Sequence, residues 1–194
     1  MNTLLVFLDT ETTGLSPRTH EVIQVGAILA REDHKNNTNP LSIVSILEYQ
    51  IELTRRDLAD PRALAINGYT EERWKNALTK RDAFSRLATR FAGARMVAHN
   101  APFDSQFLAK EFALMNIQPS FHLNPIDTLR LARSVLPQSQ HSGGYSLVSL
   151  ARHFGIPYSN AHTALADAYA TFSLYEHLKL HKQKHSKLNG NVQS

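Results

Sequence analysis

The stretch FLDTETTGL, residues 7–15, places two carboxylates directly after the apolar run TLLVFL of residues 3–8. That run is apolar at both parities, which is typical of a strand buried on both faces. Alternate side chains of a strand share a face, so Asp9 and Glu11 lie on one side at its end. Like charges at this spacing repel, and a hard divalent cation such as Mg²⁺ or Mn²⁺ relieves that repulsion. A solvated strand end is the other interpretation of an isolated Asp-x-Glu.

Further strands follow from alternating hydrophobicity. Residues 22–29 and 43–52 alternate apolar and polar side chains, as half-buried strands do. The segment between them is polar and suits a turn. The pattern of residues 3–52 therefore predicts three consecutive strands in an antiparallel meander.

Later segments alternate between helical spacing and short strands, one in RMVAHN, residues 95–100, and one near residues 122–126. Residues 57–66 are expected to form a helix, and Thr70 is expected to cap a second helix, in which Trp74 belongs to the core. This order predicts an α/β domain with a central mixed five-stranded sheet flanked by helices.

Composition narrows the class of protein. The chain has 194 residues, 42% of them hydrophobic, which is enough for one domain with a core. It has no cysteine, so a disulfide, a thiolate metal site and a cysteine nucleophile are excluded. The sequence shows no apolar run of about 20 residues and no signal peptide, which together predict a cytoplasmic protein without membrane contact. The net charge of +4 permits a polyanionic partner without requiring one.

Two later segments add acids to the first pair. Asp104 closes HNAPFD at the predicted start of a helix, where the helix N-terminus stabilises a negative charge. Asp167 lies in AHTALADA, in the first turns of the last predicted helix, among small apolar residues that make a carboxylate unusual. His162 precedes it by five residues, a spacing that separates the two side chains on a continuous helix and favours a loop position for the histidine.

Taken in order, DTETTGL, VAHNAPFD and HTALADA resemble the three motifs of the DEDDh 3′–5′ exonuclease family. This family includes the proofreading subunit of bacterial replicative polymerases and ribonuclease T. The resemblance covers about residues 3–178, and a histidine rather than a tyrosine near Asp167 points to the h branch. It implies a ribonuclease-H-like fold for one domain of residues 1–180, followed by a basic and polar tail, 181–194, that we expect to be disordered.

The resemblance also implies roles for the acids. Asp9 bridges two divalent cations, Mg²⁺ or Mn²⁺; Glu11 and Asp167 complete the first, and Asp104 holds the second. His162 acts as the general base. Two such ions and a histidine of ordinary pKa, about 6.5, are suited to phosphodiester hydrolysis near neutral pH.

Substrate contacts are expected from the loop after the first strand and from the start of the HNAPFD helix. Backbone N–H groups of residues 10–13 are candidates for binding the 3′ end. Leu15 matches the family's apolar wedge between the last two bases, with an ordinary core or loop leucine as the equal alternative. Phe103 is more typical of core packing than of base stacking. The candidate residues are Thr10, Thr12, Thr13, Leu15, Asn100 and Phe103.

The function expected is hydrolysis of single-stranded nucleic acid from its 3′ end to nucleoside 5′-monophosphates. DNA is favoured and RNA stays open, because no motif specifies contacts to the 2′-OH. The short tail favours a free-standing nuclease, while a polymerase partner or a homodimer stays open. Two alternatives are a binding module that has lost catalysis and an endonuclease or integrase on the same fold; the complete set of acids argues against the first.

Overall fold

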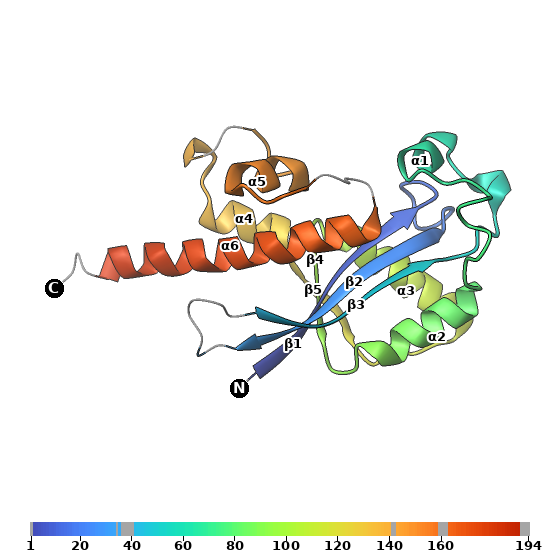
Figure 1. The fold of residues 1–194 in the computed structure, drawn as a ribbon, viewed down its shortest axis with the longest axis horizontal. Coiled ribbons are helices and arrows are strands. Elements are labelled where there is room, and N and C mark those ends of the chain that lie inside the picture. The colour runs from blue at the N-terminus through green and yellow to red at the C-terminus, as the bar shows by residue number, and fades with distance from the viewer. Residues whose placement is uncertain (1, 34, 36–40, 141–142, 159–162, 191–194) are drawn as a thin grey trace.

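The computed structural model describes residues 2–33, 35, 41–140, 143–158 and 163–190. Its centre is a five-stranded sheet in the order β3-β2-β1-β4-β5 (Figure 1). β1 pairs antiparallel with β2, β2 pairs antiparallel with β3, and β4 and β5 run parallel to β1. The strands are β1 (Asn2–Thr12), β2 (Val22–Asp33), β3 (Leu41–Gln50), β4 (Arg95–Ala98) and β5 (His122–Asp127). The predicted meander and the mixed sheet are confirmed.

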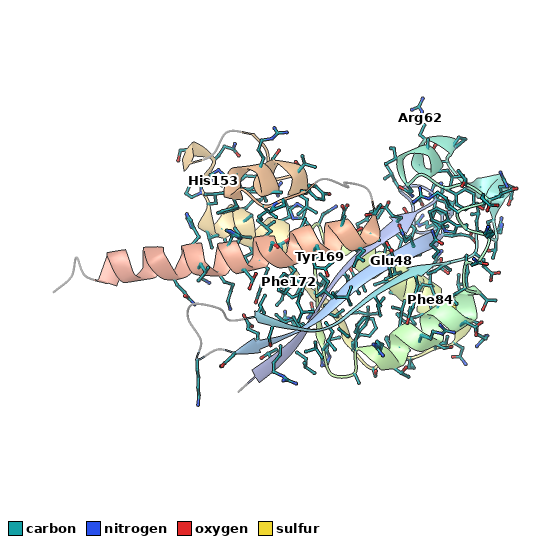
Figure 2. The ribbon with its side chains drawn as sticks, viewed as in Figure 1. Glu48, Arg62, Phe84, His153, Tyr169 and Phe172 are labelled. Carbon is teal, nitrogen blue, oxygen red and sulfur yellow. The ribbon has the colours of Figure 1, made fainter. Side chains whose placement is uncertain are left out.

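Helices cover both faces of the sheet. α2 (Lys80–Arg90) and α3 (Pro102–Met115) pack on one face, and α6 (Ala164–Gly190) packs on the other. Figure 2 labels aromatic side chains from both layers, among them Phe84 of α2 and Phe172 of α6. α4 (Thr128–Val135) and α5 (Leu147–Phe154) form a further cluster against α6. These two helix layers make the sheet the middle of a three-layer sandwich.

The parity of β1 decides which layer each side chain meets. Val6 and Leu8 face the α2/α3 layer, whereas Leu5 and Phe7 face α6. The Phe7 ring meets the Phe172 ring edge-on, with 5.1 Å between centroids. Residues 9 and 11 continue the parity of Phe7, so the strand presents both acids toward the layer that contains α6.

The predicted helix over 57–66 is wrong at its centre. The structure has a 3₁₀ turn at Arg56–Leu58 and a separate helix, α1 (Pro61–Ile66). Pro61 has no N–H to continue a helix, and it suits the first position of a new one. The side chain of Asp60 caps that new helix by accepting the backbone N–H of Arg62 at 2.8 Å.

The segment after Thr70 forms turns rather than the predicted helix. The Thr70 hydroxyl does accept the backbone N–H of Arg73, but the chain then returns to the sheet, where Leu78 forms a bridge with Ile51. Trp74 is 5% exposed and donates its indole N–H to the carbonyl of Ile23. The expectation that this tryptophan belongs to the core is confirmed.

The last helix is longer than predicted. α6 continues to Gly190, so residues 181–190 are helical where the sequence analysis expected a disordered tail. This segment has no proline and contains three lysines, a residue that tolerates helical geometry well. Figure 1 shows this part of α6 extending beyond the sheet. In the described ranges, every helix is too short or too polar to cross a bilayer.

Candidate active site

β1 places Asp9 and Glu11 near the end of the central strand of the sheet. β2 runs beside them on one side, with Asp9 opposite Gly26 and Glu11 opposite Gln24. Glu11 is buried and Asp9 is half-buried. The two carboxylates therefore begin a site at the edge of the core, as the parity of the sequence predicted.

The start of α6 lies directly over this part of β2. A Cβ atom on Gly26 would fall 2.2 Å from the backbone nitrogen of Leu165, so only glycine admits the helix at this distance. The backbone N–H of Ala164 also points to the side-chain oxygen of Gln24, at 3.4 Å. This close approach brings Asp167, in the first turn of α6, to the acids of β1.

Three of the acids meet in space. Asp9, Glu11 and Asp167 each offer a carboxylate oxygen, and these oxygens lie within 4.8 Å of one another. Asp167 also accepts the phenolic O–H of Tyr158 at 2.5 Å. An all-oxygen set of this size is suited to a hard cation such as Mg²⁺ or Mn²⁺.

Asp104 approaches the same place from the opposite layer. It lies in the first turn of α3 and is 3% exposed. One of its oxygens accepts both the backbone N–H of Thr10, at 3.0 Å, and the Thr10 hydroxyl, at 2.7 Å. Thr10 therefore ties the fourth acid to the strand that carries the first two.

The electrostatics of the cluster favour a bound cation. Burial, and then the charges of Asp104, Asp167 and Glu11, raise the pKa of Asp9 well above its usual range. Burial and the charges of Asp167 and Asp104 raise the pKa of Glu11 to about 8. Burial also raises the pKa of Asp104 to about 7, against the hydrogen bonds from Thr10. Each carboxylate is thus costly to ionise without a counter-charge, and the residues fit a divalent metal site.

Tyr158 carries the hydroxyl that reaches this cluster. Burial, the hydrogen bond to Asp167 and the charges of Asp167, Asp9 and Glu11 all raise the pKa of Tyr158 above its usual value. The phenol is therefore neutral near pH 7 and donates a hydrogen bond to the carboxylate of Asp167.

The end of β1 and the loop after it use several polar groups in hydrogen bonds within the protein. The N–H of Thr10 donates to Asp104, and the N–H of Thr13 donates to the carbonyl of Glu21 at 2.9 Å. The Thr12 hydroxyl donates to the carbonyl of Gly14. The structure thus gives the N–H groups of Thr10 and Thr13 another use than the 3′-end binding that the sequence suggested.

Gly14 and Leu15 lie at the tip of this loop. Gly14 has a φ of +155°, and a Cβ there would overlap the His20 ring, so the sharp turn requires glycine. Leu15 is 82% exposed. This exposure excludes a core leucine, whereas an ordinary loop leucine and the apolar wedge both remain as interpretations.

The other predicted contacts lie where α3 begins. Asn100 is exposed, has a φ of +61° and donates its backbone N–H to Asp127. Phe103 is half-buried, and its ring lies 4.9 Å from that of Phe107, which agrees with the predicted core packing. His162 lies outside the described residues, so its role stays a prediction.

Two residues at the site were absent from the sequence prediction, Gly26 and Tyr158. A glycine inside the alternating pattern of β2 is a signal for close backbone approach that was available in the sequence. No comparable pattern identifies Tyr158, since its contact with Asp167 depends on how α5 packs against α6.

Comparison with known proteins gives a consistent result. The family model described as Exonuclease matches residues 6–175. The DNA polymerase III subunit epsilon of Treponema pallidum (strain Nichols) is 32% identical over 183 residues, covering 94% of this chain and 78% of that protein. The protein of the same name from Rickettsia conorii (strain ATCC VR-613 / Malish 7) is also 32% identical, covering 89% of this chain and 72% of that one.

Among solved structures, E. coli exonuclease I in complex with a dT13 oligonucleotide matches with a TM-score of 0.76 at 22% identity. The match covers 96% of this chain but only 43% of the exonuclease I chain. At this identity the match shows a common fold, the ribonuclease-H-like fold that the sequence analysis expected.

Proposed function

We propose that this chain, which belongs to the exonuclease family of the DEDDh type, hydrolyses single-stranded DNA with two divalent cations. Its membership of that family makes it a 3′–5′ exonuclease. The observation that carries the proposal is the meeting of Asp9, Glu11 and Asp167, whose oxygens lie within 4.8 Å of one another. We assign this activity to a single domain of residues 1–180, within which the match to the family model falls.

The four acids have distinct roles in this proposal. Asp9, Glu11 and Asp167 would hold a first cation, Mg²⁺ or Mn²⁺, and Asp104 together with Asp9 would hold the second. When bound, such ions lower the pKa of water and offset the charge on the departing 3′ oxygen. His162 accepts the proton of the attacking water on an imidazole nitrogen. The products are nucleoside 5′-monophosphates.

Leu15 is the residue that we assign to the substrate. Its side chain is 82% exposed at the tip of a loop that continues directly from the acids of β1. A single strand presents unpaired bases whose faces bind apolar side chains, whereas a duplex hides those faces. An exposed leucine beside the metal site therefore favours a frayed or single-stranded 3′ end.

DNA is the favoured substrate because the relatives point to it. The two relatives described above are named DNA polymerase III subunit epsilon, and two of the matched exonuclease I structures contain a dT13 or a dA16 oligonucleotide. The subunit name also supports a second candidate function, proofreading beside a polymerase, in which the 3′ end comes from a polymerase partner.

The decisive experiment uses 5′-labelled DNA and RNA oligonucleotides of one sequence, with Mg²⁺, Mn²⁺ or EDTA, resolved on a denaturing gel. We expect a metal-dependent ladder that shortens from the 3′ end, faster for DNA, and no ladder with EDTA. Asp9→Ala is the inactive control, since it removes the ligand shared by both ions. A circular single strand should stay intact; its cleavage would identify an endonuclease. Oligonucleotides that stay at full length with both Mg²⁺ and Mn²⁺ would contradict the proposal.

A further inference from the structure

Tyr158 reaches the acidic site from a segment that none of the three motifs contains. It lies four residues after Phe154, the last residue of α5, and its hydroxyl donates to Oδ1 of Asp167 at 2.5 Å. The charges of Asp9 and Glu11 also act on this hydroxyl. The phenol thus donates a hydrogen bond to one carboxylate of the three-acid cluster.

The backbone around Tyr158 fixes where its ring can lie. Gly155 ends α5 in the left-handed conformation, with a φ of +66°. The next residue, Ile156, is buried and donates its N–H to the carbonyl of Ala151 at 2.8 Å. Tyr158 itself packs against the cluster of α4, α5 and α6 residues that includes Ile156. The chain therefore delivers the hydroxyl from a packed position rather than from a free loop.

A carboxylate with one oxygen held in this way has little rotational freedom. The two oxygens of Asp167 turn together about one bond, so a hydrogen bond to Oδ1 sets the direction of Oδ2 as well. Removal of a residue that hydrogen-bonds a metal ligand without contacting the metal commonly lowers metal affinity by about 10–100-fold.

We propose that Tyr158 is a positioning residue, whose hydroxyl orients Asp167 so that its carboxylate meets the cation together with Asp9 and Glu11. The inference rests on the proposed metal role of these acids. It adds a residue that touches neither substrate nor metal and acts only through Asp167.

The chain offers a matched control for the test. Tyr175, further along α6, also donates its hydroxyl to a carboxylate, that of Glu32, at 3.2 Å. Tyr175→Phe and Tyr158→Phe remove the same atom from the same kind of pair, but only the second pair includes a proposed metal ligand. A general loss of packing would affect both variants, whereas a positioning role affects one.

The experiment measures Mn²⁺ binding by electron paramagnetic resonance for the wild type, Tyr158→Phe, Tyr175→Phe and Asp9→Ala, with thermal melting to verify folding. We expect Mn²⁺ to bind Tyr158→Phe 10–100-fold more weakly, with Tyr175→Phe like the wild type. In activity assays, Tyr158→Phe should need more metal for half-maximal rate, while the KM for DNA at saturating metal stays unchanged.

Two results would overturn the inference, and they are distinguishable from failure of the proposed function. If Tyr158→Phe binds Mn²⁺ as tightly as the wild type or more tightly, while Asp9→Ala binds it weakly, the metal site stands and Tyr158 does not position it. If the wild type and Asp9→Ala bind Mn²⁺ equally weakly, the metal site itself is wrong, and the role of Tyr158 fails with it.

Discussion

Gly26 lies opposite Asp9 in the sheet, and the space left by its missing side chain is filled by the backbone of α6 at Ala164 and Leu165. This relationship connects a strand near the N-terminus with a helix about 140 residues later. Since Asp167 lies in the first turn of that helix, the glycine sets how closely the last acid approaches the first two.

Gly26→Ala should therefore disrupt the site more than an ordinary surface substitution. Its Cβ would meet backbone atoms at 2.2–2.4 Å, and a backbone cannot move aside as the end of a flexible side chain can. We expect a loss of stability of about 1–3 kcal/mol, as for other overpacked positions, with weaker Mn²⁺ binding and a large loss of exonuclease activity. Thermal melting, metal titration and the gel assay measure the three effects.

Gly144→Ala is the matched control, because a Cβ there meets nothing within 4 Å. It should melt and cleave like the wild type. Wild-type activity in Gly26→Ala would show that α6 can shift without loss of the site.

The stability of the metal-free protein should depend on pH in a direction set by its acids. The pKa of Glu11 is raised to about 8 and that of Asp104 to about 7, so the folded state binds protons that the unfolded state has released. For such groups the stabilisation is complete below the unfolded pKa, about 4, and is lost as the pH rises toward 8. Melting temperatures in EDTA should therefore fall across this range.

Mn²⁺ should reverse this trend, because the metal binds the ionised carboxylates and its affinity rises as they lose protons. Asp9, whose pKa is also raised, contributes in the same direction. Glu11→Gln removes one of these groups, and its melting temperature in EDTA should depend less on pH. A melting curve in EDTA with the same pH dependence in Glu11→Gln and the wild type would contradict the assignment of the raised pKa to Glu11.

Leu15→Ala should leave the fold intact and weaken the enzyme. A side chain that is 82% exposed contributes little to folding, so the change in stability should lie within about 0.5 kcal/mol. If the leucine packs against the terminal bases, its truncation should cost about 1–2 kcal/mol of binding, roughly ten-fold in kcat/KM.

Leu114→Ala provides the comparison for Leu15, since Leu114 is 72% exposed near the far end of α3. We expect its kcat/KM on a single-stranded oligonucleotide to equal that of the wild type. Equal values for all three proteins would remove Leu15 from the substrate site.

His162→Ala tests the general base that the family resemblance implies. Removing such a base usually slows the reaction by about 10²–10⁴-fold, and metal binding should be largely retained because the acids remain. Single-turnover rates and Mn²⁺ titration separate the two effects. A normal single-turnover rate would exclude His162 from the mechanism.

The sequence by itself determined the strands at the start of the sheet and the face that carries the first two acids. Strand parity placed Asp9 and Glu11 on one face with Phe7, and the same alternation predicted the antiparallel meander. These inferences succeed because they concern residues within one element, where the backbone repeat alone decides which side chains share a face.

Only the tertiary structure decided which distant residues meet. Thr10 binds Asp104 across 94 positions, and Tyr158 reaches Asp167 only because α5 and α6 pack together. The periodicity of apolar residues carries no information about contacts between distant elements. It therefore predicts neither the hydrogen bonds that hold the acids nor the N–H groups that those bonds occupy. The physical reason is that contacts between elements depend on the packing of whole surfaces, down to the single missing Cβ of Gly26.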